Sequence, residues 1–153
     1  SSPPKRLTSN IFHYLTDQDY LTDLFYVQCF DPSLKSFRIT LYGNFSEGVE
    51  NKKRITVEVL TDQYLEDISH LREEVFNELK IMKIIGKNAK ALETAENIYP
   101  NGFPVLTNDF VKNSKQQAML ATDAINNLQI FGKANGRTWF MGDIINDIYN
   151  KLK

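Results

Sequence analysis

Residues 61–86 have the sequence TDQYLEDISHLREEVFNELKIMKIIG. Apolar side chains recur in this stretch at intervals of three and four residues, the period of one face of an α-helix. They are Tyr64, Leu65, Ile68, Leu71, Val75, Phe76, Leu79, Met82 and Ile85. Thr61 is suited to cap the first turn, and Gly86 is suited to end the last turn in a left-handed conformation. The pattern predicts one long amphipathic helix over 61–86.

Three stretches that precede this helix alternate apolar and polar residues, which is typical of β-strands. They cover residues 25–30, 36–42 and 54–60, and the turn residues Asp31-Pro32-Ser33 connect the first two. Three antiparallel strands with one polar face need an apolar cover on the other face. We therefore predict an α+β fold in which an antiparallel three-stranded sheet is covered by the long helix.

The remainder of the chain predicts mostly helical structure. Ser114 and Gln117 form a capping-box pattern that opens a helical segment. Asn135-Gly136 lies between two apolar runs and predicts a C-terminal β-hairpin over 130–141, and a terminal helix follows from Gly142. Within the fold, residues 1–9 are expected to be a flexible lead-in and 10–153 a single globular domain.

Two further stretches have weaker patterns. Residues 10–23 indicate one or two short helical turns, and residues 87–98 are polar and compatible with a helix. The stretch Tyr99-Pro100-Asn101-Gly102-Phe103-Pro104 contains two prolines and a glycine. These residues disfavour regular structure, so we expect a loop there.

The composition limits the classes of function. The chain has 153 residues and a net charge of −1, whereas a general nucleic-acid-binding protein is usually basic. A single cysteine, Cys29, excludes an internal disulfide and fits a reducing compartment, so we expect an intracellular protein, cytoplasmic or nuclear. The sequence has no apolar run of about 18 residues, so we expect no membrane partner.

The pattern of reactive residues predicts neither catalysis nor a bound cofactor. Cys29 shares a strand face with Phe25 and Val27, which is typical of a buried and inert thiol. His70 and Glu74 lie one helical turn apart, but the second histidine of a zinc-protease helix is absent. We therefore expect no catalytic residues, no metal and no cofactor, and a protein that is not an enzyme. Acidic residues that converge only in three dimensions remain an open alternative.

Aromatic residues in the expected loop indicate a contact surface. Tyr99 and Phe103 lie where core packing explains aromatic side chains least well. We therefore predict a non-enzymatic protein–protein interaction module, a subunit or adaptor of an intracellular assembly, with these two residues in the partner-binding surface.

The predicted hairpin indicates an alternative function. Lys133 and Arg137 flank its tip, and Trp139 lies nearby. Basic side chains interleaved with aromatic ones are typical of surfaces that bind single-stranded nucleic acid. The alternative prediction is a nucleic-acid-binding domain that uses this local patch, and the same three residues are included in the predicted partner-binding set.

Overall fold

The structure is a computed structural model of the chain, and it describes residues 5–45, 52–105, 107–132 and 141–151. The chain divides into two compact units, which are described separately: 6–104, and 105–153 together with 1–5. The prediction of a single domain over 10–153 stays a prediction. The first strand begins at Arg6, inside the stretch that was expected to be a lead-in.

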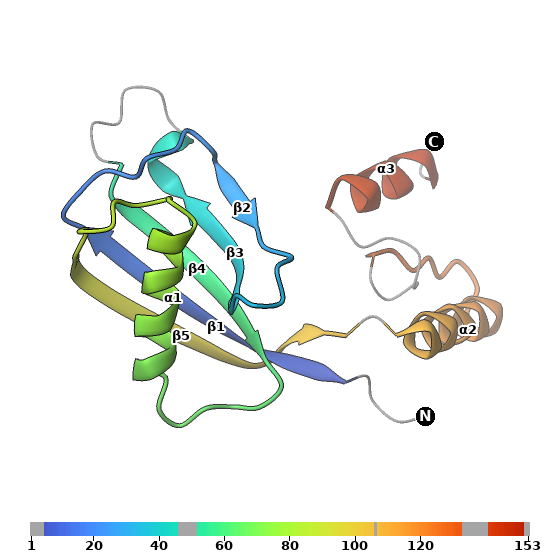
Figure 1. Cartoon of the computed structure of the whole chain (residues 1–153). Helices are drawn as coiled ribbons and strands as arrows, with labels where there is room; N and C mark the ends of the chain where they lie inside the picture. The colour runs from blue at the N-terminus through green and yellow to red at the C-terminus, as the bar shows by residue number, and fades with distance from the viewer. Residues whose placement is uncertain (1–4, 46–51, 106, 133–140, 152–153) are drawn as a thin grey trace. The chain divides into compact units, whose positions relative to one another are not determined.

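The unit formed by residues 6–104 is an antiparallel sheet with one helix on it (Figure 1). Its elements are β1 Arg6–Thr16, β2 Tyr26–Gln28, β3 Ser36–Leu41, the short helix η1 Tyr42–Asn44, β4 Arg54–Thr61, α1 Ser69–Ile81 and β5 Ala91–Pro104. The five strands are arranged in the order β2-β3-β4-β1-β5, and every neighbouring pair is antiparallel. The first strand of the chain therefore lies inside the sheet, while the last strand forms an edge.

The core lies between the sheet and α1. Phe12, Val57 and Ile39 are cross-strand neighbours on β1, β4 and β3, and all three are fully buried. Val75 and Leu79 on α1 are also fully buried and belong to the same apolar cluster. Each of these side chains stabilises the fold by about 1.5–3 kcal/mol relative to a solvent-exposed position.

A buried carboxylate ties α1 to the start of β3. Glu78 is 4% exposed and accepts hydrogen bonds from the backbone N–H of Lys35 at 2.6 Å and of Ser36 at 2.9 Å. The Ser36 hydroxyl donates a third hydrogen bond at 2.6 Å. These donors supply the compensation that a buried carboxylate requires.

A buried phenol ties α1 to β1. Tyr14 is 3% exposed, and its hydroxyl donates to the carbonyl oxygen of Arg72 at 2.8 Å. Its ring lies 5.1 Å from the ring of Phe76, measured between centroids. Burial raises the pKa of Tyr14 above the ordinary phenol value, because the phenolate would lose its hydration.

The predicted arrangement of a three-stranded sheet was wrong, although the α+β class is correct. β3 and β4 form where strands were predicted, and only Tyr26–Gln28 of the first predicted strand is extended. The error lies in β1, where helical turns were predicted, and in β5, where a helix-compatible segment and a loop were predicted. These two strands pair with each other over a long sequence separation, so no local pattern indicates the pairing.

The predicted helix over 61–86 was twice as long as the helix that forms. α1 spans Ser69–Ile81, and Thr61 is the last residue of β4 instead of a helix cap. The carboxylate of Asp67 accepts a hydrogen bond from the Ser69 N–H at 2.8 Å at the helix start. Lys83, with φ of 56°, takes the left-handed position that was expected for Gly86.

The second unit contains two described helices. They are α2 Asn108–Ala124 and α3 Met141–Lys151, and α3 is the predicted terminal helix. α2 begins six residues before the predicted start, because the Thr107 hydroxyl accepts the Phe110 N–H at 3.1 Å and caps the helix there. The predicted hairpin was wrong in its described part, since 130–132 contains no strand and Met141 begins α3. Residues 133–140 of the predicted hairpin lie outside the described residues.

Replacing Glu78 tests the link between α1 and β3. We expect Glu78→Ala to lower the free energy of unfolding by at least about 2 kcal/mol, because buried N–H donors lose a charged acceptor. Glu78→Gln retains one acceptor oxygen, so its free energy of unfolding should lie between those of the wild type and Glu78→Ala. Urea unfolding measures both values, with Glu73→Ala on the exposed side of α1 as the control. Equal stabilities of the Glu78→Ala and Glu73→Ala proteins would contradict the assigned role.

The buried phenol makes stability depend on pH in the alkaline range. Because the folded-state pKa of Tyr14 is raised, its contribution is complete below the unfolded-state value of about 10 and is lost as the pH rises towards the folded-state value. Tyr14→Phe should cost about 1 kcal/mol at neutral pH through the lost hydrogen bond. The difference from the wild type should shrink above pH ~10. Unfolding curves at neutral pH and above pH ~10 measure the difference in stability between Tyr14→Phe and the wild type. Tyr64→Phe, at an exposed position, is the control.

Candidate functional site

The sheet face opposite α1 carries polar side chains on four strands, with apolar residues of β1 among them. Adjacent residues of a strand point to opposite faces, so the neighbours of the buried core residues point to this open face. One cross-strand row on it contains Thr40, Thr56, His13 and Ala95. In the described part of 6–104, no helix lies over these residues (Figure 1).

His13 is held between two hydrogen-bonding partners on neighbouring strands. Its Nδ1 lies 2.8 Å from the Thr56 hydroxyl on β4, and its Nε2 lies 3.1 Å from Nδ2 of Asn97 on β5. An amide nitrogen can only donate, so with this amide orientation Nε2 accepts and Nδ1 carries the proton. Thr56 is only 5% exposed, which gives the imidazole a fixed neighbour. The three residues form one hydrogen-bonded chain across three strands.

A second row extends the polar character across the sheet. Arg38 on β3 and Glu58 on β4 lie opposite each other and form an ion pair, with Nε 2.9 Å from Oε1. In the same row, Ile11 separates Glu58 from Asn97. The open face therefore offers charged and neutral polar groups on four adjacent strands.

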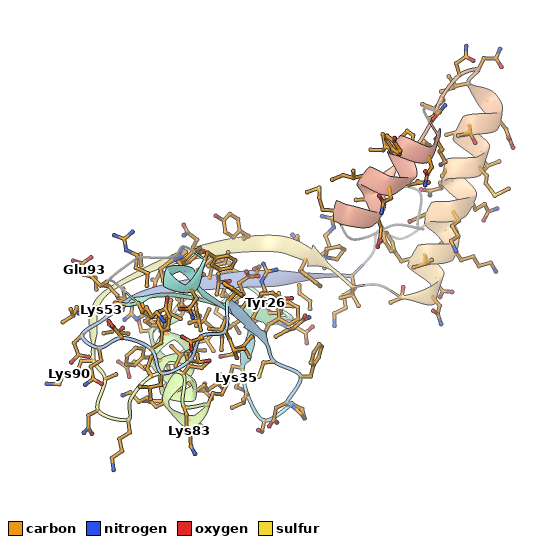
Figure 2. The ribbon with its side chains drawn as sticks, turned by 90° about the horizontal axis from the view of Figure 1, so that it is seen from above. Tyr26, Lys35, Lys53, Lys83, Lys90 and Glu93 are labelled. Atoms are coloured by element: carbon orange, nitrogen blue, oxygen red, sulfur yellow. The ribbon has the colours of Figure 1, made fainter. Side chains whose placement is uncertain are left out.

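A shallow cavity lies at one end of this face. Its volume is about 530 Å³, and the side chains that line it include His13, Tyr42, Arg54, Thr56, Glu93 and Ala95. Arg54 on β4 and Glu93 on β5 flank β1, because both lie opposite Leu15 in the register. Figure 2 shows Glu93 near this end of the sheet and Tyr26 farther along it. The Tyr42 side chain is 50% exposed.

The side chains around the cavity include a guanidinium, a carboxylate and a half-exposed aromatic ring. Arg54 supplies a guanidinium, which matches phosphate and carboxylate geometry, and Glu93 supplies an acceptor for hydroxyl groups. The ring of Tyr42 offers an apolar surface to a planar or pyranose ring. Within the residues that the structure describes, no three side chains of the metal-ligating types come together. The cavity therefore brings a few charged and polar groups to one end of the open face.

The predicted partner-binding residues are not brought together in the described structure. Tyr99 and Phe103 lie on β5 instead of in a loop, with exposed fractions of 52% and 41%. The Phe103 ring packs edge-on against Phe37 at 5.6 Å. Lys133, Arg137 and Trp139 fall outside the described residues. The interaction-module and nucleic-acid predictions therefore stay predictions.

None of the residues that form the open-face network was predicted from the sequence. Thr56 lies 43 positions after His13 in the sequence, and Asn97 lies 84 positions after it. The three residues belong to three strands, and two of these strands, β1 and β5, were not predicted. Residues 7–15 show no regular alternation of apolar and polar residues, because Leu7, Ile11 and Leu15 share a face with Ser9 and His13. A strand prediction there would have placed His13 on the side opposite Phe12.

Comparison with known proteins supports the fold. The sequence matches no family model and no curated protein. Solved structures that match include reduced UDP-galactopyranose mutase, with a TM-score of 0.60 and 11% sequence identity. The match covers 76% of this chain and 27% of the mutase chain. At this identity the likeness shows a shared fold, and the chain spans about a quarter of the length of the structure that it matches.

The prediction that the protein is not an enzyme was wrong, because the fold of this chain also occurs within an enzyme. The prediction relied on the absence of clustered reactive residues along the sequence. In the sheet, His13 and its partners converge from distant positions, so linear spacing does not report on such a site. Membrane crossing is a separate question, and none of the helices in the described ranges has the length and apolarity that crossing a bilayer requires.

The hydrogen-bonded chain predicts the tautomer of His13. In long-range ¹H–¹⁵N NMR spectra, Nδ1 of the neutral imidazole should appear protonated and Nε2 unprotonated. Asn97→Asp replaces the donor with an acceptor, so we expect the proton to appear on Nε2. Asn88→Asp, at an exposed position outside the strands, is the control and should leave the spectrum unchanged. Protonation of Nε2 in the wild type would contradict the assignment.

Proposed function

We propose that this chain forms a sheet domain of an enzyme, and that the cavity on its open face binds a nucleotide-sugar substrate. The hydrogen-bonded chain Asn97–His13–Thr56, beside the cavity, is the observation that carries the proposal. The described structure leaves this polar face uncovered by any helix of its own unit, whereas α1 packs against the opposite face over β1, β4 and β3. Polar groups that are held in place and accessible are what a binding site requires.

The substrate class follows from the groups around the cavity and from the similar structure. A nucleotide-sugar contains a diphosphate, a sugar with several hydroxyl groups and a planar base. Arg54 is suited to the diphosphate, Glu93 to sugar hydroxyls, and Tyr42 to stacking on a ring. The mutase that shares the fold is named for UDP-galactopyranose, a member of this class. In this proposal the open face is one wall of the site.

Binding of UDP-galactopyranose by the purified chain tests the proposal. In ¹⁵N-resolved NMR titrations at millimolar ligand, we expect amide shifts at His13, Thr56 and Ala95. Arg54→Ala should weaken binding about tenfold, because a charge-assisted contact worth roughly 1.4 kcal/mol is lost. Tyr42→Ala should weaken it as well, through the lost ring contact.

Two controls separate the site from general surface effects. Lys83→Ala removes a cation at the end of α1, and Tyr64→Ala removes a tyrosine of similar exposure, 56%, from the segment before α1. Both should bind like the wild type. Shifts that are absent, or that persist unchanged in Arg54→Ala and Tyr42→Ala, would refute the proposal.

A further inference from the structure

β5 is an edge strand with unusual length and little protection. It spans Ala91–Pro104, and in the described structure its sheet neighbour is β1 alone. The backbone groups on its outer side are therefore available to a further strand. Exposed edges are commonly protected by lysine or by a proline within the strand. β5 contains no lysine or arginine, and its prolines lie at positions 100 and 104, which leaves 91–99 open.

The side chains of β5 are also only partly covered. Thr94 and Glu96 lie opposite Tyr14 and Phe12, so they point to the α1 side of the sheet, yet both are exposed. Leu92, at the strand start, is 61% exposed. α1 covers the inner strands and leaves these side chains exposed, so an added strand would find Leu92, Thr94 and a Glu96 that is ion-paired with Arg72 of α1.

We infer that two copies of this chain associate through their β5 strands, paired antiparallel about a twofold axis at Ala95. The twofold axis is perpendicular to the sheet. A residue that lies a given number of positions before Ala95 in one copy is therefore opposite the residue that lies the same number of positions after Ala95 in the other copy. With the axis at Ala95, Glu93 lies opposite Asn97, and Thr94 lies opposite Glu96. Leu92 lies at the irregularity between Ala91 and Glu93, and counting from the axis brings this exposed leucine across from the apolar Ile98.

The positions of the charged side chains favour an axis at Ala95 over an axis at the adjacent residues. An axis at Glu93 or at Glu96 would place two glutamates directly opposite each other, which is destabilising. An axis at Thr94 would place Leu92 opposite Glu96, and an axis at Asn97 would pair Glu96 with Ile98. The Ala95 register contains no like-charge pair, and Glu96 is already paired with Arg72 of its own copy at 3.0 Å. A net charge of −1 adds little general repulsion between the copies.

The association joins two five-stranded sheets into one continuous sheet. Both open faces then lie on the same side, and Asn97 of each copy lies opposite Glu93 of the other. Since Glu93 lines the cavity, each copy would place polar groups at the rim of its partner's site. This inference goes beyond the substrate-binding proposal, and its test does not involve a substrate.

The test uses opposite charges at the proposed axis. Analytical ultracentrifugation of the wild-type chain should show a concentration-dependent monomer–dimer equilibrium. Ala95→Glu and Ala95→Lys each place like charges about 5 Å apart across the axis and should weaken self-association about tenfold. An equimolar mixture of the two should form a heterodimer with an affinity near that of the wild type.

Ala91 provides the matched control on the same strand. In the proposed register it lies opposite Tyr99, so Ala91→Glu and Ala91→Lys bring no like charges together. Each should dimerise like the wild type, and mixing them should produce no preference for the heterodimer. A wild-type chain that stays monomeric at all concentrations would overturn the inference. Dimers that are insensitive to both Ala95 substitutions would overturn it as well.

Discussion

Strand β1 is the element on which the rest of the sheet depends, because it is paired along both edges. β4 lies on one side in register from Thr8 to Leu15. β5 lies on the other side in register from Ser9 to Leu15, with an irregularity beyond each of these two residues. One face of β1 supplies Phe12 and Tyr14 to the core under α1. The other face supplies His13. One face of β1 therefore belongs to the packed core, and its other face belongs to the polar side of the sheet.

This division explains which parts of the fold were readable from the sequence. β3 and β4 show regular alternation because one face of each is apolar and buried, and their positions were predicted closely. β1 mixes both characters on its buried face, where Asn10 is fully buried and Phe12 follows it. The Asn10 Nδ2 donates to the Thr61 hydroxyl at 3.0 Å, whereas Oδ1 of the same amide is buried without a hydrogen-bond partner among the described residues. Such a compensating partner is invisible to a count of apolar residues.

β5 was not predicted as a strand because its side chains are mostly exposed, and the candidate site was missed together with this strand. Its side chains are largely exposed on both faces, so burial imposes no alternation on a segment such as 91–97, and helix-compatible residues are tolerated. The helix over 61–86 was overestimated because Tyr64 and Leu65 continue the helical spacing by coincidence, in a segment that precedes α1. The network around His13 depends on three strand registers at once, which only tertiary structure determines.

The polar network also restricts what can cover the open face. His13, Thr56 and Asn97 satisfy one another, but Arg54 and Glu93 keep charged groups at the cavity. An apolar layer over these charges would cost several kcal/mol unless it brought compensating groups. Whatever lies on this face must itself be polar or aqueous, as a substrate or a hydrated surface is.

The position of β1 within the sheet has a consequence for biosynthesis. β1 leaves the ribosome before the other strands of its sheet, and Asn97, the side-chain partner of His13 on β5, follows His13 by 84 residues. At typical elongation rates of about 5–20 residues per second, the nascent strand waits several seconds with one edge open. Its alternating apolar residues are a natural target for chaperones during that interval, and closure of the sheet is a late event in synthesis.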